Sequence, residues 1–225
     1  MTQPLALFPL NTVLFPGVVM PLHIFEDRYR ILVRDLMALP PGADREFGVV
    51  ALKAGYEVGD GGVHTIQRTG CAALVTEINA NADGTFEIIV IGRRRFHVER
   101  LDPSRDYLRA DVEWLGDQDG VMHDDAEVWA QTARDLFEVY RDTVEQLRGD
   151  DVLEGPTPTD PVDLSYTMAA ALVLNLAQRQ SLLECADVPR RLRLGITFMR
   201  AELSAITAIP SLPATSMART LCSPN

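Results

Sequence analysis

Apolar and polar residues alternate through much of the first half of the chain, which is the pattern of half-buried strands. Between residues 108 and 114, apolar side chains occupy the even positions and charged side chains the odd ones. A short apolar run at 47–52 predicts a buried strand, and residues 94–101 predict another. Residues 70–78 and 85–91 flank a loop rich in Asn, Asp and Gly, so we expect a long β-hairpin there.

Apolar residues at helical spacing occur once near the N-terminus and then dominate the second half of the chain. The predicted helices cover residues 25–39, 126–148, 164–177 and 189–206. The third of these is apolar nearly all round, which predicts a central, buried helix. Asp160 followed by Pro161 has the form of a helix start, and Asp187 is placed to cap the last helix.

The order of these elements, strands first and helices afterwards, predicts an α+β fold. We expect a β-rich N-terminal lobe at residues 1–118, with one interposed helix, and a C-terminal helical bundle at residues 119–207. Residues 208–225 have few helix signals and are expected to form a flexible tail.

Composition and charge exclude several classes of function. The 225 residues are 47% hydrophobic, which is enough to form a core without disulfides or metal ions. The net charge is −11. Residues 111–163 hold 16 acidic and 3 basic side chains, so the chain should repel nucleic acid. No apolar run is long enough for a membrane span, and the N-terminus lacks the features of a signal peptide. The three widely spaced cysteines predict no disulfide framework and a cytoplasmic location.

The sequence contains no recognisable catalytic or metal-binding motif. Lys53 is the only lysine, and no GxxxxGK phosphate-binding loop precedes it. None of the four histidines lies close to a cysteine or another histidine, and no GxSxG is present. We therefore expect no metal, no cofactor and no enzymatic activity.

Residues 7–26 are unusual because prolines recur among large apolar residues with almost no charge. Prolines at this spacing exclude a helix and interrupt strand pairing, which predicts extended pieces at the edge of a sheet. Two interpretations remain open. Phe8, Leu10, Val13, Leu14 and Phe15 seal the end of a β-barrel, or some of these side chains stay exposed and bind extended polypeptide.

The same segment, LFPLNTVLFPGVVMPLHIFEDRYRILV, resembles the signature that opens the N-terminal substrate-binding domain of the Lon protease family. The stretch IGRRRFHVERL at 91–101 is similar to a later strand of that family. QSLLE at 180–184 and RRLRL at 190–194 resemble its closing helical segment. The resemblance covers about residues 5–207.

The resemblance implies a PUA-like pseudo-barrel followed by a helical bundle, and a role in recognising protein substrates. It implies unfolded or client polypeptides as partners, together with an ATP-dependent protease. Full-length Lon proteases also contain an ATPase module and a Ser–Lys peptidase domain. This sequence has no Walker A motif and no suitable lysine, so we expect a stand-alone form that binds without ATP and without cutting. A small-molecule or nucleic-acid module on a PUA-like fold is the alternative.

Within the matched motif, the candidate substrate-binding residues are Phe8, Pro9, Leu10, Pro21, Leu22, His23, Ile24, Phe25, Glu26, Arg28 and Tyr29. Two of them have structural alternatives. The Glu26 carboxylate can accept backbone N–H groups at a helix start or pair with Arg95 across the barrel. His23 can make a hydrogen bond within a turn.

Overall fold

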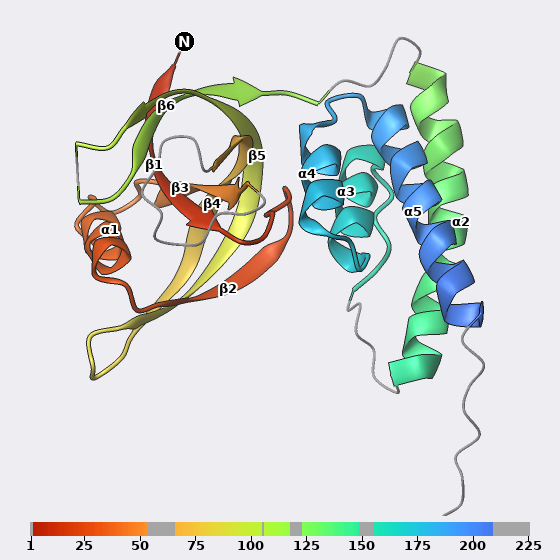
Figure 1. The fold of residues 1–225 in the computed structure, drawn as a ribbon, viewed down its shortest axis with the longest axis horizontal. Helices are drawn as coiled ribbons and strands as arrows, with labels where there is room; N and C mark the ends of the chain where they lie inside the picture. The colour runs from red at the N-terminus through yellow and green to blue at the C-terminus, as the bar shows by residue number, and fades with distance from the viewer. Residues whose placement is uncertain (1, 54–65, 105, 118–122, 149–154, 209–225) are drawn as a thin grey trace, which may run out of the picture.

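The computed structural model describes residues 2–53, 66–104, 106–117, 123–148 and 155–208 (Figure 1). Its strands are β1 (Gln3–Leu10), β2 (Val19–Ile24), β3 (Glu46–Leu52), β4 (Ile66–Ala80), β5 (Phe86–Asp102) and β6 (Arg109–Leu115). Its helices are α1 (Asp27–Met37), α2 (His123–Arg148), α3 (Pro161–Ala171), α4 (Leu176–Glu184) and α5 (Val188–Ala208). The α+β fold class is confirmed. The predicted tail lies outside the described residues, apart from Ala208 at the end of α5.

The six strands form one sheet in the order β2-β5-β4-β3-β1-β6, and an additional pairing between β5 and β6 closes a ring. β1 and β3 are parallel, and the other pairs are antiparallel. The strands predicted at 85–91 and 94–101 are one continuous strand, β5. Its first part pairs with β2, and its last part pairs with β6. β2 therefore extends the ring beyond its closed part and forms an edge of the sheet.

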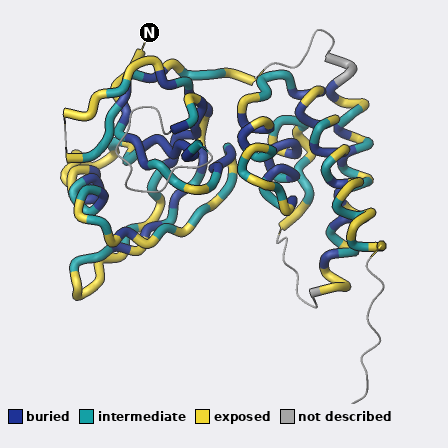
Figure 2. The backbone as a smooth tube through the Cα atoms, viewed as in Figure 1, coloured by how far each residue is buried: buried dark blue, intermediate teal, exposed yellow. Residues whose placement is uncertain are grey.

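Apolar side chains fill the barrel and the space under α1. The buried face of α1 presents Tyr29, Leu32, Val33 and Leu36 to the barrel, as the helical spacing predicts. The ring of Tyr29 stacks on that of Phe8 with centroids 4.0 Å apart. Buried positions gather inside the barrel and between the helices, whereas the outer side of α1 is exposed (Figure 2).

The helices of the second half pack together beside the barrel, with α3 and α4 nearer to it than α2 and α5 (Figure 1). The predicted helix at 164–177 is wrong as a single element. α3 ends at Ala171, and Asn175 starts α4 with a capping box in which its side chain accepts from the Gln178 N–H. Because this stretch is apolar on all sides, it shows no helical periodicity that could be interrupted. The sequence pattern therefore does not reveal where α3 ends and α4 begins.

A buried polar cluster joins the barrel to the helices. Arg95 of β5 and Arg191 of α5 are 1% and 0% exposed, and both contact the carboxylate of Asp117, at 3.1 and 2.9 Å. The Tyr166 hydroxyl donates to the same carboxylate at 2.7 Å. Arg95 also donates to the carbonyl of Leu183 at 3.0 Å. We call Arg95, Asp117, Tyr166 and Arg191 the interlobe cluster.

Within the ranges given above, no helix has the length and apolar character that crossing a membrane requires.

Candidate functional site

A cavity of about 220 Å³ opens where β1, β2 and the start of α1 meet. It is lined by Phe8, Pro9, Leu10, Leu22, His23, Ile24, Phe25, Glu26 and Tyr29. All of these belong to the set that the sequence predicted, while Pro21 and Arg28 of that set lie outside the lining. We call this space the barrel-gap cavity, because β1 and β2 are not paired with each other there.

The lining of the cavity divides into a buried floor and an exposed rim. Phe8, Ile24 and Tyr29 are buried and form the floor. Phe25 lies at the rim with 63% of its surface exposed, although it is a large apolar side chain. The sealing interpretation therefore holds for Phe8, and also for Val13, Leu14 and Phe15, which are buried in the barrel core. Leu10, the fifth of these side chains, is partly buried against the core, and the exposed apolar side chain at the rim is Phe25, which was not among the five.

The Glu26 carboxylate takes neither role expected from the sequence. Glu26 is the N-cap residue of α1, but its side chain makes no capping hydrogen bond. Instead it accepts two hydrogen bonds from Arg28, at 3.0 and 2.7 Å. The predicted pair with Arg95 is also wrong, because Arg95 points to the helices and is held in the interlobe cluster. Glu26 and Arg28 thus form a partly buried ion pair beside the cavity.

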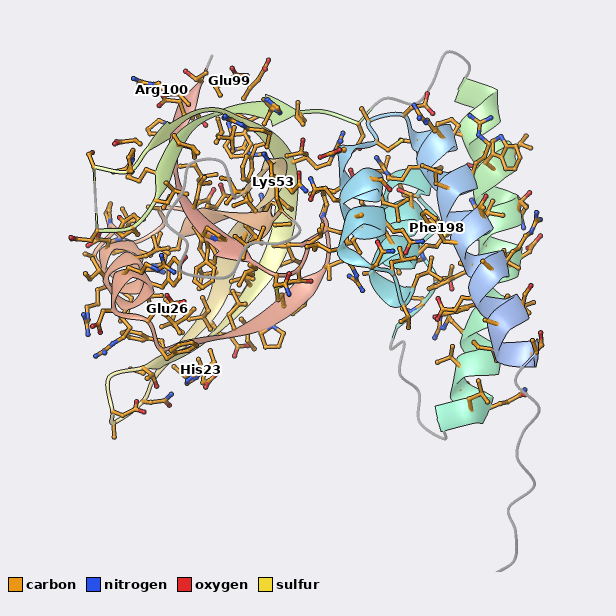
Figure 3. All side chains as sticks on the ribbon, viewed as in Figure 1. His23, Glu26, Lys53, Glu99, Arg100 and Phe198 are labelled. Carbon is orange, nitrogen blue, oxygen red and sulfur yellow. The ribbon has the colours of Figure 1, made fainter. Side chains whose placement is uncertain are left out.

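The expected turn hydrogen bond of His23 is also wrong, because His23 lies within β2. Its Nδ1 is 2.5 Å from Oε1 of Glu87, the residue opposite it on β5. The imidazole also stacks against Phe25, with ring centroids 5.9 Å apart. Figure 3 shows His23 and Glu26 on the same side of the barrel, away from the helices. His23, which is itself exposed, thus packs against the exposed ring of Phe25.

The polar chemistry of the cavity suits binding better than proton transfer. Burial raises the pKa of the Tyr29 hydroxyl to about 12, with a smaller opposing effect from Arg28, so Tyr29 stays protonated near neutral pH. Across the described ranges, no group of three His, Cys, Asp or Glu side chains is placed to hold a metal ion. What the cavity offers is an apolar floor with a few polar groups at its rim.

A second cavity, of about 530 Å³, lies between the start of β2 and the helices. Its lining is Gly17, Val18, Val19, Phe137, Arg141, Gly155, Pro156, Pro158, Thr167, Ala170 and Ala171. Val19 is 60% exposed at its edge. The sequence did not identify the residues that line this interlobe cavity, because its walls come from segments more than 100 residues apart. The small residues Ala170 and Ala171 on a helix expected to be central were the only available signal.

The chain matches the family model described as the ATP-dependent protease La (LON) substrate-binding domain over residues 4–201. Among curated relatives, it is 27% identical over 207 residues to Lon protease 2 of Syntrophobacter fumaroxidans, and 27% identical over 196 residues to the Lon protease of Escherichia coli K12. These matches cover 91% and 87% of the chain but only 25% and 24% of the relatives. The chain therefore spans about a quarter of the length of these proteases.

Solved structures agree with the family match. The chain is similar to the crystal structure of a Lon N-terminal domain protein from Xanthomonas campestris, with a TM-score of 0.62, 25% identity, and coverage of 88% of this chain and 99% of that one. It also shares its fold with the N-terminal domain of a Mycobacterium avium complex Lon protease, with a TM-score of 0.66, 20% identity, and coverage of 88% and 98%.

Proposed function

Because the chain belongs to the family of LON substrate-binding domains, we propose that it binds unfolded polypeptides through the barrel-gap cavity and catalyses no reaction itself. The observation that carries the proposal is the exposed ring of Phe25 above an apolar floor. An exposed apolar side chain beside an apolar cavity is typical of a surface that contacts another macromolecule. Unfolded chains present the apolar side chains that such a surface can take up.

The size of the cavity supports a side chain as its occupant. Pockets for drug-sized ligands or cofactors measure roughly 300–1,000 Å³, whereas the barrel-gap cavity has about 220 Å³. A space of this size accepts an apolar side chain or two. Because a flexible client must become ordered on binding, we expect affinities on the order of micromolar.

Two further parts of the proposal concern context. The relatives named above are proteases, so an ATP-dependent protease is the partner that would receive a bound client. The few, widely separated cysteines favour a reducing cytoplasm. Assays of ATP hydrolysis and of casein degradation with the purified chain should both give no signal above buffer.

A small-molecule site is the second candidate, and the interlobe cavity favours it, because about 530 Å³ falls in the range of ligand pockets. Binding of RNA has less support, since the net charge of −11 repels a phosphate backbone. A thermal-shift screen with metabolites would favour the small-molecule candidate if one of them raised the melting temperature.

The proposal is tested by titrating a fluorescent, reduced and alkylated unfolded protein with the chain. We expect Phe25→Asp to weaken binding at least about five-fold, because a charge replaces the apolar contact at the rim. Leu147→Asp is the matched control, since Leu147 has the same exposure of 63% but lies near the end of α2. Equal loss in both variants, or no binding by the folded wild type, would count against the barrel-gap cavity.

A further inference from the structure

We propose that a client segment binds as an added β-strand along the open edge of β2, with one apolar side chain in the barrel-gap cavity and a second in the interlobe cavity. This inference rests on the proposed function and specifies its substrate class. The class is an extended segment with two apolar side chains a fixed distance apart and basic residues toward the end that meets the helices.

The first step is the open edge itself. β2 is an end strand of the sheet and pairs only with β5 among the described strands. Hydrogen bonds from the Gly17 N–H to the Gly92 carbonyl and from the Gly92 N–H to the Val18 carbonyl, at 2.8 and 2.9 Å, fix which residues face β5. Since backbone groups alternate along a strand, Met20, Leu22 and Ile24 bond to β5.

The residues between them, Val19, Pro21 and His23, therefore direct their backbone groups away from β5. The position of Pro21 fits this assignment, because a proline has no N–H to contribute and is tolerated on the free side of an edge strand. Among the residues that the structure describes, the N–H and carbonyl groups of Val19 and His23 have no backbone partner outside β5, so they are available to an added strand. An extended polypeptide supplies the complementary groups, and side-chain pockets then give specificity.

The second step is the position of the two cavities at opposite ends of this edge. Val19, at the start of β2, lines the interlobe cavity, and Leu22 to Phe25, at its end, line the barrel-gap cavity. In Figure 1, β2 runs along the barrel from the side of the helices toward α1. His23 and Phe25 line the barrel-gap cavity, are exposed like Val19, and lie on the same face of the extended segment, four and six residues further along. At about 3.3 Å per residue, they are roughly 13 and 20 Å from Val19.

This separation sets the spacing of the client's two anchors. An added strand covers the distance between the cavities in four to six residues. Side chains alternate between the two faces of a strand, so anchors on one face must be an even number of residues apart. Spacings of i,i+4 and i,i+6 satisfy both conditions, whereas i,i+3 and i,i+5 do not.

The third step is charge. The interlobe cavity is bordered by α2, which contributes Phe137 and Arg141 to its wall. The Arg141 guanidinium donates a hydrogen bond to the carbonyl of Gly155 at 2.9 Å. Arg141 is the one charged residue among the described lining residues, but Glu138 of α2 accepts from Thr157, which lies between the lining residues Pro156 and Pro158. The described side chains of α2 carry more carboxylates than guanidinium groups, namely Glu127, Asp135, Glu138, Asp142 and Glu145 against Arg134 and Arg141. A client whose flank carries Lys or Arg complements this surface, and an acidic flank is repelled.

The test uses fluorescent peptides with two Phe residues in a polar background and Lys at the ends, measured by anisotropy against the full chain. We expect the i,i+4 or i,i+6 peptides to bind at least five-fold more tightly than the i,i+3 and i,i+5 peptides. Replacing Lys by Glu should weaken binding, and high salt should reduce that difference. N-methylation of single peptide amides should weaken binding at every second position, the pattern expected of strand addition.

Two protein variants complete the test. Val19→Glu should abolish the advantage of the second anchor, whereas Val128→Glu, at an equally exposed valine on α2, should not. Circular dichroism would show that both variants are folded. If the wild type binds unfolded protein but shows neither the spacing dependence nor the alternation, this inference is overturned and the proposed function stands. If the wild type binds no unfolded protein or peptide, both are overturned.

Discussion

At the scale of single residues, burial changes the acid–base behaviour of the barrel core. It raises the pKa of Tyr29 to about 12 and that of the Cys71 thiol, on β4, also to about 12. Burial raises the pKa of Tyr166 as well. In each case the folded protein keeps a proton that the unfolded chain releases at lower pH.

This difference predicts how stability depends on pH. Between about pH 9 and 12 the unfolded chain binds fewer protons than the folded protein, so the free energy of unfolding falls as pH rises. Tyr29→Phe removes one of the titrating groups and keeps the ring that stacks on Phe8, so its decline above pH 10 should be shallower. Urea denaturation at pH 8, 9, 10 and 11 measures both effects. A free energy that stays constant up to pH 11 would contradict the prediction.

Charged residues also show which side-chain roles the sequence could predict. The helix caps Asp160 and Asp187 were predicted correctly, because their partners lie two or three residues further along the chain. Arg95 was placed in a pair with Glu26, whereas its partners are Asp117 and backbone carbonyls that include Leu183. No periodicity encodes a contact across 88 residues, so only the backbone topology determines it.

At the scale of secondary-structure elements, the close approach of β5 to the turn before β2 requires a glycine. A Cβ atom at Gly92 would lie 2.1 Å from the carbonyl oxygen of Phe15. This oxygen belongs to the backbone of Phe15, whose side chain is buried in the core. The backbone of Phe15 therefore cannot move aside easily. The absence of a side chain at Gly92 thus lets the Phe15–Gly17 turn lie directly against β5.

We therefore expect Gly92→Ala to lower the free energy of unfolding by about 1–3 kcal/mol, the range of overpacked sites. Gly116→Ala is the control, because nothing lies within 4 Å of the position that its Cβ would take. Its free energy of unfolding should be close to that of the wild type. Urea denaturation at neutral pH compares the three proteins, and equal stability of both variants would be the contrary result.

Strong local patterns predicted most elements, and weak ones caused the errors. The hairpin of β4 and β5, the alternation in β6 and the helical spacing of α1, α2 and α5 each contain a clear period. The break between α3 and α4 depends on the capping box of Asn175, which a uniformly apolar stretch concealed. In the candidate site, the family resemblance indicated the barrel-gap residues as two stretches of one motif, whereas the lining of the interlobe cavity depends on the packing of distant segments.

At the scale of the whole molecule, side-chain contacts connect the barrel to the helices. The interlobe cluster connects β5 to α5 through one carboxylate, that of Asp117. The Gln180 side chain of α4 also donates to the backbone carbonyl of Thr69 on β4, at 3.1 Å. The predicted division near residue 118 stays a prediction, and these contacts indicate that the two lobes are coupled in stability.

Removing the shared carboxylate tests this coupling. Asp117→Ala leaves two buried guanidinium groups without a counter-charge, so we expect a loss of about 3–5 kcal/mol in the free energy of unfolding. Scanning calorimetry should show one transition for the wild type and a lower or divided one for the variant. Asp111→Ala is the control, since it removes an ion pair with Arg100, whose side chain is 81% exposed, and should change little. Two separate wild-type transitions that Asp117→Ala leaves unmoved would contradict the coupling.

The ring of strands has one more consequence, for the order in which the protein is made. β1 pairs with β6 through residues as distant as Gln3 and Val112, so the ring cannot close until β6 has left the ribosome. Until then the proline-rich apolar segment that starts the chain has no complete barrel to cover it. During its own synthesis, the nascent protein thus briefly exposes an apolar segment. Such segments are what we propose the folded protein binds in other polypeptides.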